Sequence, residues 1–574
     1  MLHLVHLVQY DVSSELSGIP WFRVHGIILN DPGRLIQAIY VVLGFTSTTS
    51  LLWAVHLSWA CWSLDGPHHS VLSRCGHSMT CCRYILHYLL ETTQVCRLNW
   101  NVGVVTFFGA DVVKLAGLQQ ACISEVLLID GITAFCVQVL HDESFWLSCG
   151  ALVILAVGSP TLGATAYSAV TLLAHSNDAW LIGSLIGPNG AAIFKHSMPS
   201  ASSFGMQWLI ETPAPGVITR KSVCEPLASG IISVDSLVPV GRGQRELVVG
   251  DRQTGKTSIG LDTILNQTGL GTLCLLSALG QKATPALGTC LAIASRDAFG
   301  FLTISMASAS ASAVSQFLNT YATSSMTEFF MWTKKSACPA FYDDLSKHAV
   351  AYRELSLLLR QPPGREAFPG EIFFVHSRLL ERSCKPHFGL SGGSVTAFPV
   401  VETLASDVSG FITTNMISIT DGQIFLSVDL FLANYRPAVD VGLSVTRVGS
   451  AAQTSSMKQV GGAFKIDMAQ YFELQAFSQF AADIGPETQV RLARGVRLIT
   501  LLTQDAGNTL SIRQQVQTLC LSNQDSFVVM STPQLKRLCG LLQTVPEWLS
   551  IVIPITAVFT VLMVGMCRHL EGHI

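Results

Sequence analysis

A glycine-rich segment in the middle of the chain has the residue types that bind phosphate. Residues 250–258 read GDRQTGKTS, and Gly250, Gly255, Lys256 and Thr257 follow the spacing G-x-x-x-x-G-K-T. Glycines let the backbone approach phosphate closely, so that N–H groups and the start of the next helix face the anion. The lysine supplies a countercharge, and the threonine hydroxyl is a ligand for Mg²⁺. The segment predicts a site for a nucleoside triphosphate, with Mg-ATP the first choice.

The surroundings of this loop agree with the prediction. An apolar strand precedes it and a helical run over residues 259–267 follows, which is the context that the motif needs. All nine loop residues are assigned to the cofactor site: Gly250, Asp251, Arg252, Gln253, Thr254, Gly255, Lys256, Thr257 and Ser258.

A second acidic element should hold the metal from a neighbouring strand. Residues 341–344 read FYDD, and Asp343 is the favoured carboxylate on the magnesium side, partly through water, with Asp344 as its neighbour. Either aspartate could instead cap a helix over residues 345–360. Because a proline removes a donor from a central strand, we expect this strand to begin after Pro339.

Three successive patterns of apolar residues along the chain predict the helices and strands that position these residues. Residues 1–200 are apolar and contain few clear turn signals, with strand-like segments such as residues 101–109. From about Glu211, short apolar runs alternate with glycine-rich turns and helical periods, which favours a parallel sheet with crossover helices. After about Ser455 the apolar residues recur three and four apart, over residues 457–480 and 486–504, so a helical domain is expected.

Composition narrows the classes of protein. The chain has 574 residues, enough for several domains. Its net charge of -3 lacks the excess of basic residues that favours binding to nucleic acid or to an acidic membrane surface. Charged residues make up only 13%, against about 25% in ordinary soluble proteins. More of this chain than usual must therefore be buried.

Three runs without Asp, Glu, Lys or Arg are long enough to cross a bilayer: residues 35–64, 146–174 and 548–567. Proline, glycine or a row of serine and threonine interrupts each run, so consecutive buried strands or core helices remain the alternative. Residues 61–87 hold a cysteine and histidine cluster that lacks the spacing of structural zinc sites, and we interpret its side chains as packing groups. The N-terminus has no visible presequence.

Longer motifs resemble the alpha subunit of the F-type ATP synthase, in a divergent, plastid-like form. They are PAPGVITRKSV at residues 213–223, GRGQREL at 241–247, the loop itself, DDLSKHAVAYRELSLLLRQPPGREAFPG at 343–370, HSRLLER at 376–382, TNMISITDGQIFL at 414–426 and RPAVDVGLSVTRVGSAAQ at 436–453. The resemblance is dense over residues 211–504 and patchy before them, where residues 101–109 and 181–190 look like a barrel strand and a glycine turn.

The resemblance implies three domains. They are an N-terminal β-barrel with an apolar insertion over residues 1–130, a central α/β RecA-like P-loop nucleotide-binding domain over 131–453 with a further apolar insertion, and a C-terminal α-helical domain over 454–574. It also implies partners: beta subunits that alternate with this chain in a hexameric ring of three alpha and three beta, the gamma central stalk, and delta with the peripheral stalk. The membrane would be reached through the proton-translocating sector, with no nucleic acid involved.

Roles for single residues follow from the same resemblance. Gln281 stands where a catalytic subunit has a carboxylate that orients water, and an amide cannot act as a general base. Arg447 matches the arginine finger that reaches the catalytic site of the adjacent beta subunit. Arg436, Pro437 and Gln504 match positions around the adenine pocket. Ala506 replaces a second glutamine there, which leaves base selectivity open.

These residues predict a non-catalytic, regulatory subunit in ATP synthesis coupled to proton transport. An autonomous RecA-like ATPase motor or translocase is the alternative, and a membrane transporter with a nucleotide-sensing domain is a third reading. Short motifs, such as LSVDLF at residues 426–431, look more plastid-like than mitochondrial. We therefore expect the stromal side of the thylakoid membrane, with the mitochondrial inner membrane or the bacterial plasma membrane as alternatives.

Overall fold

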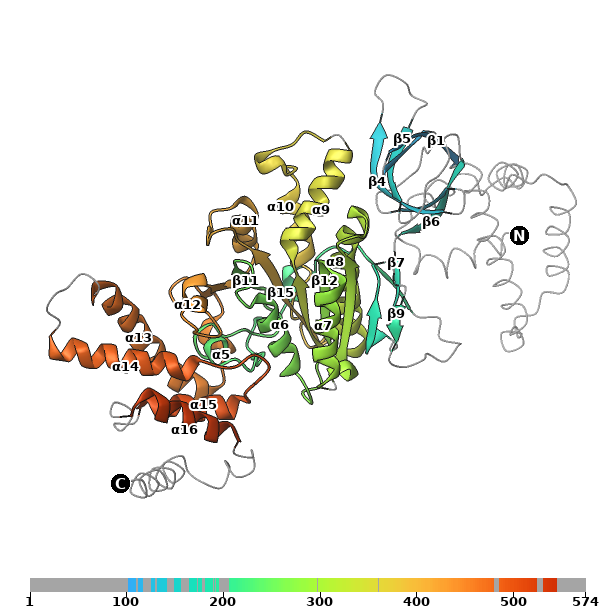
Figure 1. Ribbon diagram of the computed structural model, residues 1–574. Helices are drawn as coiled ribbons and strands as arrows, with labels where there is room; N and C mark the ends of the chain where they lie inside the picture. The colour runs from blue at the N-terminus through green and yellow to red at the C-terminus, as the bar shows by residue number, and fades with distance from the viewer. Residues whose placement is uncertain are drawn as a thin grey trace, which may run out of the picture. The chain divides into compact units, whose positions relative to one another are not determined.

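A computed structural model of the chain describes the N-terminal strands in pieces and most of the chain from Met206 onwards (Figure 1). The described residues are 102–109, 112–116, 125–129, 132–141, 149–155, 165–172, 174–177, 181–188, 190, 192–195, 206–296, 298–359, 361–478, 485–523 and 530–544. By its internal contacts the chain divides into two units, Met1–Leu172 and Leu173–Ile574.

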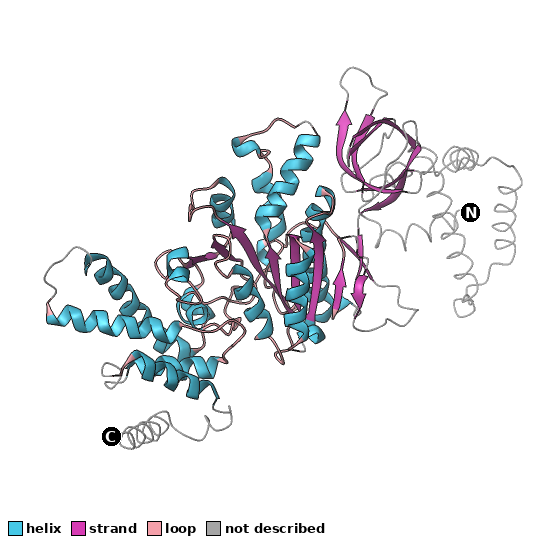
Figure 2. Ribbon diagram, viewed as in Figure 1, coloured by secondary structure: helices cyan, strands magenta, loops and turns pink. Residues whose placement is uncertain are grey.

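The second unit is built on a mostly parallel nine-stranded sheet (Figure 2). Its order is β17-β16-β11-β15-β14-β12-β13-β8-β9, and only the outer pairs β16–β17 and β8–β9 are antiparallel. The strands are β8 Ser184–Ile186, β9 Ala192–Lys195, β11 Glu246–Gly250, β12 Cys274–Gln281, β13 Leu302–Ser308, β14 Ala337–Asp343, β15 Ser394–Glu402, β16 Gly422–Leu426 and β17 Val445–Thr446. A separate antiparallel pair joins β7 Ala174–Asn177 to β10 Met206–Leu209. The predicted parallel sheet is confirmed.

Helices connect the strands and cover the sheet (Figures 1 and 2). They are α5 Ile232–Leu237, α6 Lys256–Leu265, α7 Ala283–Ala294, α8 Ala313–Phe329, α9 Leu345–Leu358, α10 Ile372–Leu380, α11 Phe411–Ile419 and α12 Val428–Leu432. Helix α8 packs on β12 and β13, α6 on β11, and α9 on β15. The runs predicted as helical after the phosphate loop and after Asp344 correspond to α6 and α9.

Both faces of the central strands of the sheet are buried, which explains the continuous apolar runs of these strands. Along β11, Val248 belongs to one core cluster, while Leu247 and Val249 belong to another. In the first cluster, Phe341 stacks on Phe398 of the adjacent strand with ring centroids 4.6 Å apart. Packing on both sides fixes β11 and β14, whose ends carry the phosphate loop and Asp343.

The start of β14 was predicted wrongly. The strand begins at Ala337 and includes Pro339, which pairs with Thr396 of β15. Pairing between β14 and β12 begins only at Ala340. The proline therefore lies before that ladder is established, and its missing N–H interrupts little of it.

The first unit contains six antiparallel strands that form a closed barrel in the order β1-β2-β5-β4-β3-β6. They are β1 Val102–Gly109, β2 Val112–Ala116, β3 Glu125–Ile129, β4 Ile132–His141, β5 Cys149–Leu155 and β6 Thr165–Leu172. A domain boundary at residues 130/131 would fall between β3 and β4, which pair with each other. The barrel needs its last strand to close, so the structure divides the chain after Leu172 instead.

The C-terminal part of the second unit is helical, as expected. Its helices are α13 Ser455–Ser478, α14 Pro486–Leu502, α15 Ile512–Cys520 and α16 Thr532–Thr544. Proline at the first position of α14 suits a helix start, because its missing N–H needs no partner there. Within the described part of the chain, no helix is both long and apolar enough to span a bilayer.

The described parts of the apolar run 146–174 are strands β5 and β6 and the first residue of β7, which agrees with the alternative of consecutive strands. The runs 35–64 and 548–567 and the cysteine and histidine cluster lie outside the described residues.

Candidate nucleotide-binding site

The phosphate loop leaves β11 at Gly250 and enters α6 at Lys256. Gly255, with φ of 95°, takes the left-handed conformation just before the helix, which glycine adopts without strain. A Cβ added to Gly250 would lie 2.9 Å from the Leu426 Cβ, so only glycine fits there without rearrangement. The loop is closed by a hydrogen bond of 2.8 Å from the Thr254 hydroxyl to the Asp251 carbonyl. Sequence and sheet packing together impose the loop shape.

Lys256 is held inside this loop. Its Nζ donates to the carbonyl oxygens of Gly250 at 2.8 Å and Asp251 at 2.6 Å. Burial lowers the pKa of Lys256, while the nearby carboxylates of Glu402, Asp344, Asp343 and Asp251 act in the opposite direction. A buried ammonium bonded only to carbonyl groups gains from an anion, because an anion supplies the missing countercharge.

Four neighbouring strands end along the same edge of the sheet. In sheet order they are β11, β15, β14 and β12, and their last residues are Gly250, Glu402, Asp343 and Gln281. Open parallel sheets bind ligands beyond the carboxyl ends of their strands. The order of the strands therefore brings together segments that lie far apart in the sequence.

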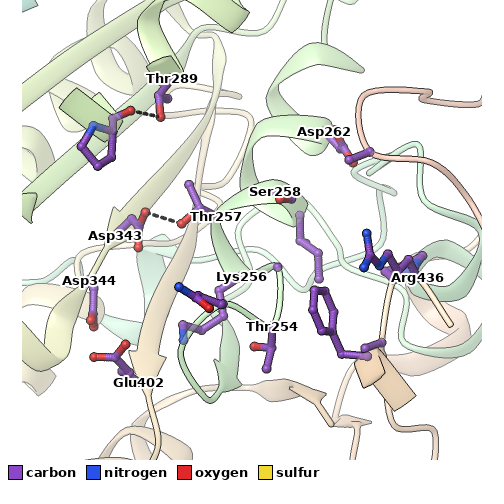
Figure 3. A pocket seen from close by; sticks show the side chains of 18 of the residues that line it. Thr254, Lys256, Thr257, Ser258, Asp262, Thr289, Asp343, Asp344, Glu402 and Arg436 are labelled. Atoms are coloured by element: carbon purple, nitrogen blue, oxygen red, sulfur yellow. Dashed lines mark hydrogen bonds between the residues drawn. The ribbon is translucent and has the colours of Figure 1, made fainter. Parts of the chain in front are cut away.

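A short hydrogen-bonded row links the loop to the predicted metal carboxylate (Figure 3). The Thr257 hydroxyl donates to Asp343 Oδ2 at 2.8 Å, the bond drawn between them in Figure 3. Gln281 Nε2 donates to the same oxygen at 2.9 Å. Burial raises the pKa of Asp343, although these donors and nearby lysines oppose the effect. A half-buried hydroxyl beside a carboxylate is a hard oxygen pair that suits Mg²⁺.

Four other carboxylates line the same pocket, and two of them, Asp344 and Glu402, lie with Lys256 at its phosphate end, where each has a partner in the protein. Asp344 caps α9 by accepting the N–H of Ser346 at 2.7 Å, and burial raises its pKa to about 6. Glu402 pairs with Arg252, with Nε and Oε1 3.0 Å apart. The carboxylates are thus committed to a helix cap and an ion pair, while Gln281 stands beside Asp343.

The pocket has a volume of about 850 Å³, a size that suits a nucleotide. Segments after β16 and α14 form the wall that lies across the loop from Asp343 in Figure 3, where Arg436 is labelled. Among the predicted residues, those that line the pocket are Gln253, Thr254, Gly255, Lys256, Thr257, Ser258, Gln281, Asp343, Arg436, Pro437 and Gln504. Ala506 is also in this wall.

Four predicted residues do not line the pocket. Gly250 supports the loop from the end of β11, and Arg252 reaches towards Glu402. The Asp251 carboxylate accepts the N–H of Ser406 at 2.9 Å, so it braces the loop from outside. Arg447 is exposed just after β17, at the far edge of the sheet.

The sequence reasoning missed several lining residues, above all Glu402, Phe431 and Asp262. Glu402 had a readable signal, because it is the polar residue that ends the apolar run of β15. Phe431 had none that we can identify. Its role depends on the Arg436 guanidinium lying 4.6 Å from its ring centroid, a contact set by the turn after α12.

Comparison with known families agrees with this geometry. Residues 230–446 match the ATP synthase alpha/beta family, nucleotide-binding domain, and residues 453–544 match the ATP synthase alpha/beta chain, C terminal domain. The two matches together cover more than half of the chain and include the whole pocket. The site is a nucleotide-binding site, and the chain belongs to the ATP synthase alpha/beta family.

Proposed function

We propose that this chain is the non-catalytic, regulatory alpha subunit of a proton-translocating F-type ATP synthase. It binds Mg-ATP in its own pocket and donates Arg447 to the catalytic site of an adjacent beta subunit. The observation that carries the proposal is Gln281 at the end of β12, hydrogen bonded to Asp343 where hydrolysis would need a base.

The chain's own residues can bind a nucleotide without turning it over. The loop N–H groups and Lys256 hold the phosphates, and Thr257 with Asp343 would hold Mg²⁺, which supplies charge neutralisation when it is bound. An attacking water needs an acceptor for its proton. The Gln281 amide provides none, and its N–H is directed to Asp343. Bound ATP would therefore be retained intact.

Arg447 supports the second half of the proposal. It is exposed, and no residue in the described ranges bonds to its guanidinium. A guanidinium that approaches a transferring phosphoryl group neutralises the charge that develops there. The proposed assembly is a ring in which three copies alternate with three beta subunits around the gamma central stalk, with delta and the peripheral stalk attached.

We propose the stromal face of the thylakoid membrane as the location, reached through the proton-translocating sector. Fractionation of organelle membranes, followed by immunodetection of this chain, tests it. Recovery with the mitochondrial inner membrane would point to the alternative location.

The functional proposal is tested with the purified full-length chain. It is loaded with labelled ATP and Mg²⁺, passed over a desalting column and quenched in acid, and the bound nucleotide is identified by chromatography. We expect intact ATP after many minutes, and no bound label in a Lys256→Ala control. Steady release of phosphate would instead favour an autonomous ATPase motor in which Glu402 or Asp344 serves as the base.

A further inference from the structure

The strand that precedes Arg447 is too short to fix its own position. Strand β17 has only the two residues Val445–Thr446, lies at the edge of the sheet and pairs with β16 alone. Val445 is exposed and Thr446 is half-buried, so little apolar burial holds the strand. Segments with few buried apolar contacts open most easily. The position of Arg447 therefore depends on side-chain bonds as well.

The Gln244 side chain supplies such a bond from the segment just before β11. Its Nε2 donates to the Thr446 hydroxyl at 2.9 Å and to Glu246 Oε2 at 2.6 Å, and its Oε1 accepts the N–H of Gly241 at 2.8 Å. A primary amide has two N–H donors and one acceptor oxygen, so every polar group of this side chain is used. Gln244 is fully buried, and a bond lost there is not replaced by water.

The glycine of β16 makes room for this bridge. Glu246, Gly422 and Thr446 form one row across β11, β16 and β17. The Glu246 carboxyl lies directly over the middle residue, because a Cβ added to Gly422 would be 2.5 Å from Glu246 Oε2. The Gln244 amide bonds to that carboxyl and to the Thr446 hydroxyl, so it links the first strand of the row to the third.

Arg447 is tied to the same segment at the next position. Its main-chain N–H donates to the Asp421 carbonyl, and the Asp421 carboxylate receives two bonds from the Arg245 guanidinium. Two consecutive residues, Gln244 and Arg245, thus hold Thr446 and Arg447, which are also consecutive. Gln244 does not line the nucleotide pocket, and it lies at the end of β11 opposite to the phosphate loop.

We infer that Gln244 is a positioning residue for Arg447. By holding Thr446 against β11, it sets the place from which the Arg447 guanidinium reaches the catalytic site of the adjacent subunit. This inference rests on the proposed role of Arg447 and adds to it a residue that touches no nucleotide. A misplacement of about 1 Å can cost about 10²-fold in rate, so a buried bridge beside the reacting group affects turnover.

The test uses the full-length chain assembled with its catalytic partner. Gln244→Leu keeps the approximate volume of the side chain and removes both donors. We expect multisite turnover to fall by about 10²-fold, while binding of ATP to this chain's own pocket stays unchanged. Normal turnover in an assembled Gln244→Leu complex overturns the inference.

A double variant separates positioning from general support of the fold. In a chain that already has Arg447→Ala, Gln244→Leu should cause no further loss, because no guanidinium is left to position. Release of labelled phosphate over hours resolves the residual turnover. An equal loss with and without Arg447 overturns the inference. If Arg447→Ala alone leaves turnover normal, the proposed function fails; if it lowers turnover and Gln244→Leu does not, only the inference fails.

The matched control is Gln267→Leu. The Gln267 amide is also buried and donates to main chain, to the carbonyls of Ala228 at 2.7 Å and Thr263 at 3.2 Å, but it has no bond to β17. Turnover should stay unchanged in this variant. A loss as large as that in Gln244→Leu would show that removing any buried amide lowers turnover, and it would overturn the inference.

A pair of substitutions at Thr446 decides the question if Gln244→Leu fails to assemble. Thr446→Val removes only the hydroxyl that accepts from Gln244, so we expect a smaller loss of turnover, about tenfold. Thr446→Ser keeps the hydroxyl and should keep turnover near that of the parent. Equal turnover in the two variants overturns the inference.

Discussion

The phosphate loop and the segment after β17 present their basic side chains in opposite ways. Lys256 is buried, and its ammonium bonds to two carbonyl groups of its own loop. Arg447 is exposed, and its main-chain N–H donates to the Asp421 carbonyl at 2.8 Å. The difference is consistent with the proposal that Lys256 binds a ligand of this chain, while Arg447 acts on a ligand outside it.

The backbone that carries Arg447 is nevertheless firmly held. Arg245 makes two bonds to the Asp421 carboxylate, at 2.7 and 3.0 Å, and Asp421 in turn receives the N–H of Arg447. Gln244 donates to the Thr446 hydroxyl at 2.9 Å. A fixed backbone suits a residue that must act at a set position on another molecule. Because the main chain is already ordered, only the Arg447 side chain has to be ordered when the partner binds.

The largest effect should come from removing the exposed cation. In the assembled complex, Arg447→Ala should lower multisite turnover by about 10³- to 10⁵-fold, because the charge on the transferring phosphoryl group is no longer neutralised. Binding of ATP to this chain's own pocket should be unchanged. Steady-state turnover and nucleotide binding are measured on the same preparation.

Two controls accompany Arg447→Ala. Arg491→Ala removes another exposed arginine, on α14, which pairs with Glu487 of the same helix, and should leave turnover unchanged. Arg447→Lys keeps the charge but loses the planar fork, so we expect partial activity at most. If turnover in Arg447→Ala stays near normal, Arg447 does not act at the catalytic site of a neighbouring subunit, and the contrast with Lys256 fails.

A smaller effect is expected at the buried cation. Lys256→Ala should weaken binding of ATP by about 10²- to 10³-fold, because a buried charge partner of phosphate typically contributes about 3–4 kcal/mol. Titration with a fluorescent ATP analogue measures this loss. Lys458→Ala, which removes an exposed lysine on α13, is the control. Undiminished binding in Lys256→Ala would show that the loop is not the phosphate site.

Local patterns predicted the phosphate end of the pocket well. Fixed spacing around Gly250 and Lys256, the apolar strand before them and the helix after them are properties of neighbouring residues, so the sequence contains them directly. The same holds for α14, whose apolar period and starting proline are visible in the chain.

Features that depend on distant segments could not be predicted in this way. The limit of the barrel follows from β6 closing against β1, a pairing between strands far apart in the chain. Pro339 is tolerated because of where pairing with β12 begins. The hydrogen bonds from the Gln504 side chain to the carbonyls of Gly230 and Asn508 form only because the segment after α14 packs against the start of α5. The spacing of apolar residues along the chain carries no information on such contacts between distant segments.

The smallest effect concerns the free energy of unfolding and sharpens the contrast between buried and exposed charge. Burial raises the pKa of Asp344 from its ordinary 3.8 to about 6. The folded chain therefore holds this proton more tightly than the unfolded chain. Stability from this group is fully present below about pH 4 and is lost as the pH rises through 6.

Asp344→Asn should abolish that loss, because the amide oxygen can still accept the Ser346 N–H while carrying no charge. In the nucleotide-free protein we expect the variant to be more stable than the parent by roughly 2 kcal/mol at pH 7.5, with the advantage shrinking as the pH falls towards 5. Thermal and denaturant unfolding across that pH range measure it. Arg447→Ala, by contrast, should leave stability unchanged at every pH, since its charge is already in water. A pH-independent gain in Asp344→Asn would mean that the carboxyl is not penalised by burial, and that the pocket carries its negative charge without help from a bound cation.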